Sequence, residues 1–118
     1  MYLQNKTVLF LGDSITEGVG VSVPEKNYVS VFRELSGANV VNYGVSGTRI
    51  AKTRHPSADA GWDRYFLLRA DDMQEDADVA VVFGGTNDFG HGTADLGTFA
   101  SRDVYTFYGA LHLLRRKC

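Results

Sequence analysis

The stretch from Thr7 to Glu17, TVLFLGDSITE, decides the fold. It begins as a continuous apolar run, which is typical of a short strand covered on both faces of a parallel sheet. The run stops at Gly12, and a helical pattern starts directly after Asp13 and Ser14. A buried strand that passes through a glycine turn into a helix is the first half of a β–α unit, so this stretch predicts the α/β class.

Two further apolar runs, Asn39–Tyr43 and Asp78–Phe83, are each followed by glycine. Amphipathic patterns separate and follow these strands, at residues 28–35, 62–73 and 104–116. The resulting order, β-α-β-α-β-α, predicts right-handed crossovers and a parallel sheet. The 118 residues suit a single domain spanning residues 1–118.

Composition excludes several classes of protein. The net charge is −2 without a basic block, which argues against nucleic-acid binding and against attachment to anionic membranes. We find no apolar run of membrane-spanning length and no signal-peptide core, so we expect a cytoplasmic protein without a membrane span. Cys118 is the one cysteine, and neither a metal motif nor a cofactor motif is present.

Chemistry-bearing residues follow each predicted strand. Ligands of open α/β sheets bind outside the carboxyl ends of the strands, so we expect these turns to share one edge. Ser14 would stand at the start of a helix, where developing negative charge is favoured, and could act as a nucleophile. The alternative is a capping box, with Ser14 as the N-cap and Glu17 three residues later.

Two further groups could stabilise an oxyanion. The backbone N–H of Gly44 and the side-chain amide of Asn87 are candidate donors, and each is typically worth about 3–4 kcal/mol of transition-state stabilisation. The alternatives are a tight-turn glycine for Gly44 and an Asx turn or an N-cap for Asn87. A serine flanked by two such donors is the arrangement that acyl transfer requires.

Three sequence blocks resemble those of the SGNH (GDSL-type) hydrolases. They are Gly12-Asp13-Ser14, Asn42-Tyr43-Gly44-Val45-Ser46-Gly47 and Gly84-Gly85-Thr86-Asn87-Asp88. The resemblance implies a flavodoxin-like, three-layer α/β/α fold with a parallel sheet, without a metal or cofactor. It implies hydrolysis of acyl or acetyl esters, of sugars or lipids, through an acyl-serine intermediate.

The same resemblance assigns roles to individual residues. Ser14 is the expected nucleophile, and Asp13 supports it. The backbone N–H groups of Ser14 and Gly44, with the side chain of Asn87, form the expected oxyanion hole.

The chain departs from the family at the catalytic base, a histidine that lies three residues after an aspartate late in the chain. Asp88 and His91 have this spacing but follow the third strand, so we expect them to lie near the cleft, where they could contact substrate. His55 and His112 lack the spacing. We therefore expect the chain to lack the catalytic Asp-x-x-His region and to be weakly active or inactive.

The expected lack of the family's later strands also has a structural consequence. By resemblance, the sheet is reduced to about three strands in the order 2-1-3, and its last strand becomes an exposed apolar edge. Such an edge favours pairing with another chain, so we expect a homo-oligomer.

Two other functions remain open. A pseudo-hydrolase could bind an acylated sugar or a carboxylate without turnover. Flavin or nucleotide binding is disfavoured, because the first turn matches neither G-x-G-x-x-G nor the P-loop pattern.

Overall fold

A computed structural model describes residues 3–117, except for the side chain of His91. The chain forms two compact units. The first unit comprises Met1–Ser46 and Met73–Phe83, and the second comprises Gly47–Asp72 and Gly84–Cys118. The assignment of residues 1–118 to one domain stays a prediction.

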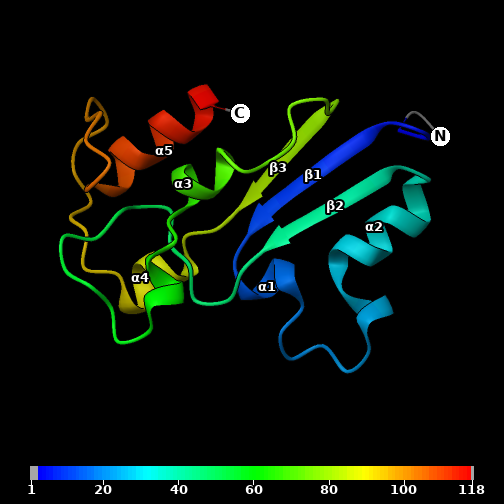
Figure 1. Cartoon of the computed structure of the whole chain (residues 1–118), viewed down its shortest axis with the longest axis horizontal. Coiled ribbons are helices and arrows are strands. Elements are labelled where there is room, and N and C mark those ends of the chain that lie inside the picture. The colour runs from blue at the N-terminus through cyan, green and yellow to red at the C-terminus, as the bar shows by residue number, and fades with distance from the viewer. Residues whose placement is uncertain (1–2, 118) are drawn as a thin grey trace. The chain divides into compact units, whose positions relative to one another are not determined.

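A parallel sheet forms the centre of the first unit. Its strands are β1 (Thr7–Gly12), β2 (Asn39–Gly44) and β3 (Val79–Phe83), in the order β2-β1-β3. Figure 1 shows them side by side, with β1 in the middle. The central strand is the most buried of the three, and its residues from Val8 to Gly12 are all buried. The predicted parallel sheet in the order 2-1-3 with flanking helices is confirmed.

Helix α2 (Tyr28–Ser36) packs against this sheet through an aromatic cluster. The ring of Phe10 on β1 meets Tyr28 and Phe32 edge to face, with centroids 5.8 and 5.3 Å apart. Val29 is buried in the same core, whereas Leu35 is 70% exposed. The amphipathic pattern of residues 28–35 includes Leu35 among its apolar positions, yet the helix turns this side chain to solvent.

Asn27 explains the orientation of α2. Its side-chain oxygen accepts a hydrogen bond from the backbone N–H of Val29 at 2.7 Å and so caps the helix. Its amide nitrogen donates to the carbonyl of Thr16 at 3.1 Å, which fixes the helix start against the preceding turn. This long-range bond sets which side chains face the sheet, and periodicity alone does not reveal it.

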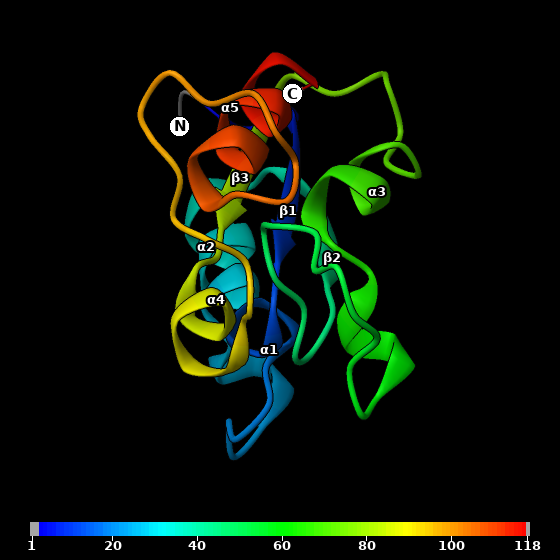
Figure 2. The ribbon, with the colours of Figure 1, turned by 90° about the vertical axis from the view of Figure 1, so that its left-hand side faces the viewer.

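The second unit contains the α-helices that follow β2 in the chain. They are α3 (Phe66–Ala70), α4 (Thr86–His91) and α5 (Phe107–Lys117). Helix α3 packs against α5, and Figure 2 shows the segment that runs from α4 to the start of α5. Short helical turns complete the chain: α1 (Ser14–Glu17), η1 (Pro24–Lys26) and η2 (Ala60–Asp63).

Both predicted helices of this unit are shorter than their sequence patterns. Residues 62–73 yield the end of η2 and the five-residue α3, and the side chain of Arg69 bonds the carbonyl of Arg64 and the hydroxyl of Thr48. Helix α5 begins three residues later than predicted. The hydroxyl of Thr106 accepts a hydrogen bond from the backbone N–H of Gly109 and caps it there.

Among the described residues, no helix is both long and apolar enough to cross a membrane.

The edge strand β3 generates the first prediction. Val79, Val82 and Phe83 are all exposed on this strand, and an exposed apolar edge favours pairing with a second chain. We expect light scattering to show a mass that rises with concentration in the micromolar range. The substitution Val82→Lys should return the protein to a monomer, because a charged edge resists pairing.

Val21→Lys is the matched control, because Val21 has the same exposed fraction as Val82, 37%, and lies in a loop outside the sheet. A wild-type protein that stays monomeric across the same concentration range would contradict the prediction.

Candidate active site

The turn from β1 into α1 carries the expected nucleophile. Asp13 is the N-cap of α1, and its Oδ1 accepts a hydrogen bond from the backbone N–H of Ile15 at 3.0 Å. Ser14 therefore occupies the first helical position, and the capping-box alternative is wrong for Ser14. Its hydroxyl is half-buried and bonds to no other described group of the first unit.

Asp13 is itself almost completely buried, with 1% of its surface exposed. Its second oxygen, Oδ2, has no hydrogen-bond partner among the described residues. A buried carboxylate of this kind is costly unless other groups compensate it. The capping bond is the compensation that the first unit supplies, and it fixes the turn that presents Ser14.

Gly44 ends the neighbouring strand, directly beside α1. A Cβ at this position would collide with the backbone nitrogen of Glu17, so the close packing of α1 on β2 requires glycine. The first unit thus brings the turns of Ser14 and Gly44 together at the carboxyl ends of adjacent strands.

The N–H of Gly44 already has a partner. It donates to the side-chain oxygen of Asn42 at 2.8 Å, and the amide nitrogen of Asn42 donates to the carbonyl of Thr16 at 2.7 Å. The side chain of Asn42 therefore bridges the end of β2 and α1. An oxyanion could use the Gly44 N–H only in exchange for the bond to Asn42.

Asn87 lies in the second unit, at the start of α4. The N-cap of this helix is Gly85, without a side-chain bond, so the N-cap alternative for Asn87 is wrong. The amide nitrogen of Asn87 donates to the carbonyl of Thr48 at 2.9 Å. An amide nitrogen carries two hydrogens, so one remains for a ligand. The convergence of Asn87 with Ser14 and Gly44 stays a prediction.

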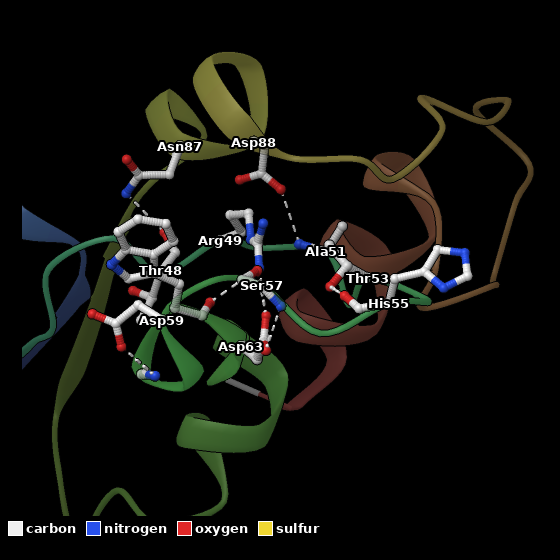
Figure 3. Close-up of polar contacts among 12 residues, drawn as sticks. Thr48, Arg49, Ala51, Thr53, His55, Ser57, Asp59, Asp63, Asn87 and Asp88 are labelled. Atoms are coloured by element: carbon white, nitrogen blue, oxygen red, sulfur yellow. Dashed lines mark hydrogen bonds and ion pairs between the residues drawn. The ribbon is translucent and has the colours of Figure 1, made fainter.

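Asp88 holds α4 to the segment that follows β2. Its two oxygens accept hydrogen bonds from the backbone N–H groups of Ile50 and Ala51, at 2.9 and 3.0 Å. Figure 3 shows the carboxylate reaching towards Ala51. Asp88 also lines a cavity, and its contact with substrate stays a prediction. The side chain of His91 lies outside the described part of the chain, and its role stays a prediction as well.

All three histidines belong to the second unit. The Nε2 atom of His112 lies 2.7 Å from the carbonyl oxygen of Phe99, and its ring packs against that of Phe99. In Figure 3 the imidazole of His55 points away from Asp63. Among the described side chains, neither His55 nor His112 contacts the carboxylate that would orient a catalytic base.

The second unit also contains a polar cluster that the sequence pattern did not predict. Arg49 is 3% exposed, and its guanidinium bonds the hydroxyl of Ser57 at 2.6 Å and the carboxylate of Asp63 at 2.8 Å. Figure 3 shows the three side chains converging. The side chain of Asp63 is 29% exposed, so it joins the cluster and still reaches solvent. No periodic signal links the three residues, because Arg49 and Ser57 lie in irregular chain and Asp63 ends the short turn η2.

Trp62 and Arg49 also line a cavity of about 190 Å³ beside this cluster, together with residues 55–58 and Thr93. Trp62 packs on Gly47, where a Cβ would overlap the indole ring. Among the described residues, no group of three potential metal ligands is close enough to hold an ion.

Comparison with known proteins supports the family that the three sequence blocks indicate. Residues 10–117 match the model of the GDSL-like lipase/acylhydrolase family. No curated protein matches the chain.

Solved structures also resemble the chain. One crystal structure shares 37% identity with a TM-score of 0.81, covering 98% of this chain and 52% of the other. A protein from Lactobacillus plantarum shares 32% identity with a TM-score of 0.73, covering 94% and 48%. A carbohydrate acetylesterase family member from Sinorhizobium meliloti shares 25% identity with a TM-score of 0.60, covering 94% and 51%. The chain thus spans about half the length of these structures.

The cap formed by Asp13 generates a stability prediction. Asp13→Ala removes the acceptor for the N–H of Ile15 and should lower the free energy of unfolding by about 1 kcal/mol. Asp13→Asn retains an acceptor and should cost less, since asparagine caps helices about as well as aspartate. Urea unfolding measures both variants, and equal losses would show that the cap is not the source of the effect.

The Asp63 cluster generates a prediction about pH. Hydrogen bonds from Ser57, assisted by the charge of Arg49, hold the pKa of the Asp63 carboxyl below its usual value of 3.8. Because the folded-state pKa is the lower one, the unfolded state binds more protons between the two pKa values. The stabilisation is therefore complete above about pH 3.8 and is lost as the pH falls through the folded-state pKa.

Asp63→Asn should accordingly lower the melting temperature at pH 7, and the difference from the wild type should shrink below about pH 3.8. Asp72→Asn is the matched control, because it removes an exposed carboxylate of the same unit outside the cluster. A difference that stays constant down to acidic pH would contradict the assignment.

Proposed function

Because the chain belongs to the GDSL-like lipase/acylhydrolase family, we propose that it acts on acyl or acetyl esters through an acyl-serine intermediate on Ser14. One observation carries the proposal: the cap formed by Asp13 leaves the Ser14 hydroxyl uncommitted at the first position of α1. A serine that served as a structural cap would have its hydroxyl occupied by the helix.

The proposed reaction has two steps. The Ser14 oxygen attacks the ester carbonyl carbon, and the resulting oxyanion is stabilised by N–H donors. When the tetrahedral intermediate collapses, the bond to the alcohol breaks and the alcohol leaves with a proton. Water then attacks the acyl-serine, releases the carboxylic acid and restores Ser14.

Three groups are the proposed donors to the oxyanion: the backbone N–H groups of Ser14 and Gly44 and the amide of Asn87. The Gly44 donor becomes available when the substrate oxygen replaces Asn42 as its acceptor. The Gly44 N–H would stabilise the oxyanion less than an unoccupied donor, because its bond to Asn42 is lost when its bond to the substrate oxygen forms.

The proton that leaves Ser14 needs a base. Among the described histidines, neither His55 nor His112 is oriented by a carboxylate. Removal of the base from a serine triad lowers turnover by about 10⁴- to 10⁶-fold, and the remaining catalysis comes from the oxyanion hole and binding. We therefore propose that this chain alone turns over slowly or not at all.

The likeness to a carbohydrate acetylesterase family member supports acylated sugars as one candidate substrate class, with lipid esters as the other. The lack of an oriented histidine favours a second candidate function. In that case the chain is a non-catalytic module that binds an acylated sugar or a carboxylate.

Covalent labelling separates the two functions. We expect a fluorophosphonate probe to label Ser14 slowly, because no oriented base activates this serine, and to leave Ser14→Ala unlabelled. Ser22→Ala, in an exposed loop of the same unit, is the control that should label like the wild type. Mass spectrometry of the intact chain measures the modification.

Hydrolysis of p-nitrophenyl acetate completes the test. Labelling of Ser14 together with slow turnover supports the hydrolase proposal. Absence of labelling favours the binding module. Robust turnover that depends on Ser14 would refute the proposal that the base is missing.

A further inference from the structure

Two cations of the second unit pack on tyrosine rings. The ammonium nitrogen of Lys52 lies 5.5 Å from the centre of the Tyr65 ring and 5.3 Å from the centre of the Tyr105 ring. The guanidinium carbon of Arg54 lies 4.4 Å from the centre of the same Tyr105 ring. These four residues form the tyrosine–cation cluster, which none of the roles assigned above uses.

Contacts with the rings hold both cations in place, because a cation within about 6 Å of a ring centre is attracted by the ring. The backbone beneath them is fixed as well. The N–H of Lys52 donates to the carbonyl of Val104 at 3.0 Å, and the N–H of Tyr105 donates to Oδ1 of Asp103 at 3.0 Å. Long cationic side chains lose rotamer freedom when they bind a ligand, and side chains that are already held lose less of it. The cluster is therefore preorganised in a way that an isolated surface lysine is not.

The cluster carries more positive charge than neighbouring carboxylates neutralise. The distances of Lys52 and Arg54 from one ring centre place their charges within the ~10 Å over which charges act in 0.1 M salt, so the two cations repel each other. Oδ2 of Asp103 lies 3.6 Å from the guanidinium of Arg54, and both side chains are exposed. Lys52 forms no ion pair in the described part of the chain. An anion bound between the two cations would relieve their repulsion.

The charge of the second unit also favours an anionic ligand. This unit contains nine lysine and arginine residues against seven aspartates and no glutamate, although the whole chain has a net charge of −2. The positive charge of the chain is thus concentrated in the unit that contains the cluster, where it attracts anions.

The donors of the cluster suit a tetrahedral oxyanion. The guanidinium of Arg54 presents N–H donors in a fixed plane and can take two oxygens of one phosphate or sulfate group. The ammonium of Lys52 adds donors from a separate side chain. The hydroxyls of Tyr65 and Tyr105 bond to no described residue and can donate as well. A phosphate or sulfate monoester has three terminal oxygens to accept these bonds, whereas a carboxylate has only two.

We propose that the tyrosine–cation cluster binds the phosphate or sulfate group of a monoester. The group lies between Lys52 and Arg54 and replaces Asp103 as the partner of the guanidinium. This binding site does not depend on the proposed hydrolysis at Ser14, and it adds recognition of an anionic ligand to the chain.

Titration of the whole chain with small anions tests the proposal. Methyl sulfate and methyl phosphate are the probes, acetate is the carboxylate for comparison, and sodium chloride keeps the ionic strength constant. Backbone amide NMR shifts of Lys52, Arg54 and Tyr105 report binding. We expect saturable shifts with the monoesters and a dissociation constant about tenfold higher for acetate, which lacks one charge-assisted hydrogen bond. The monoester that binds more tightly identifies which of the two groups the cluster prefers.

Substitutions locate the bound anion. Lys52→Gln should raise the dissociation constant about tenfold, the value of one hydrogen bond to a charged group. Asp103→Asn should lower it, because this change frees Arg54 and keeps an acceptor for the N–H of Tyr105. Tighter binding cannot result from damage to the fold, so this variant keeps the test decisive. Arg116→Gln is the matched control, because it removes one exposed cation of the same unit from the last turn of α5 and should leave the constant nearly unchanged.

Three outcomes would overturn the proposal. Chloride would reproduce the shifts at the same ionic strength, which would indicate screening without a site. Acetate would bind more tightly than both monoesters, or Arg116→Gln would weaken binding as much as Lys52→Gln does. Fluorophosphonate labelling of Ser14 is unaffected by any of these results, so the hydrolase proposal stands or fails separately.

Discussion

The hydrogen bond from the Ile15 N–H to the carboxylate of Asp13 is the interaction on which the candidate site depends. It ends β1, starts α1 and places Ser14 one position inside the helix. The short helix then lies so close to β2 that Gly44 must be glycine. One buried carboxylate therefore fixes both the expected nucleophile and the turn beside it, at the cost of burying a charged group.

Carboxylates fill the same structural role in the second unit. Asp88 binds the N–H groups of Ile50 and Ala51, and Asp63 binds Ser57 and Arg49. Irregular segments carry many backbone N–H groups that neither helix nor sheet can satisfy, and carboxylates accept several of them at once. Polar bonds of this kind help to order the irregular segments of the second unit.

The ordering of irregular segments by hydrogen bonds has a functional consequence. Groups that stabilise an oxyanion must be in place before the reaction starts, and hydrogen-bonded loops provide such order. Such order also has a disadvantage: the Gly44 N–H already donates to Asn42 and must break that bond before it can bind an oxyanion. Gly44 and Asn87, the proposed oxyanion donors, thus already have hydrogen-bond acceptors, whereas neither described histidine side chain is oriented by a carboxylate.

The sequence by itself determined the strands, their parallel pairing and the family, because apolar runs and adjacent turn motifs are local signals, and the order 2-1-3 followed from the family resemblance. Tertiary structure decided which residue caps α1, which face of residues 28–35 is buried, and that Arg49, Ser57 and Asp63 form a cluster. The cap is a hydrogen bond between residues only two apart, whereas the other two outcomes depend on contacts between more distant residues or residues in irregular chain. Periodicity carries no information about such contacts, because it records which residues share a face and not what that face meets.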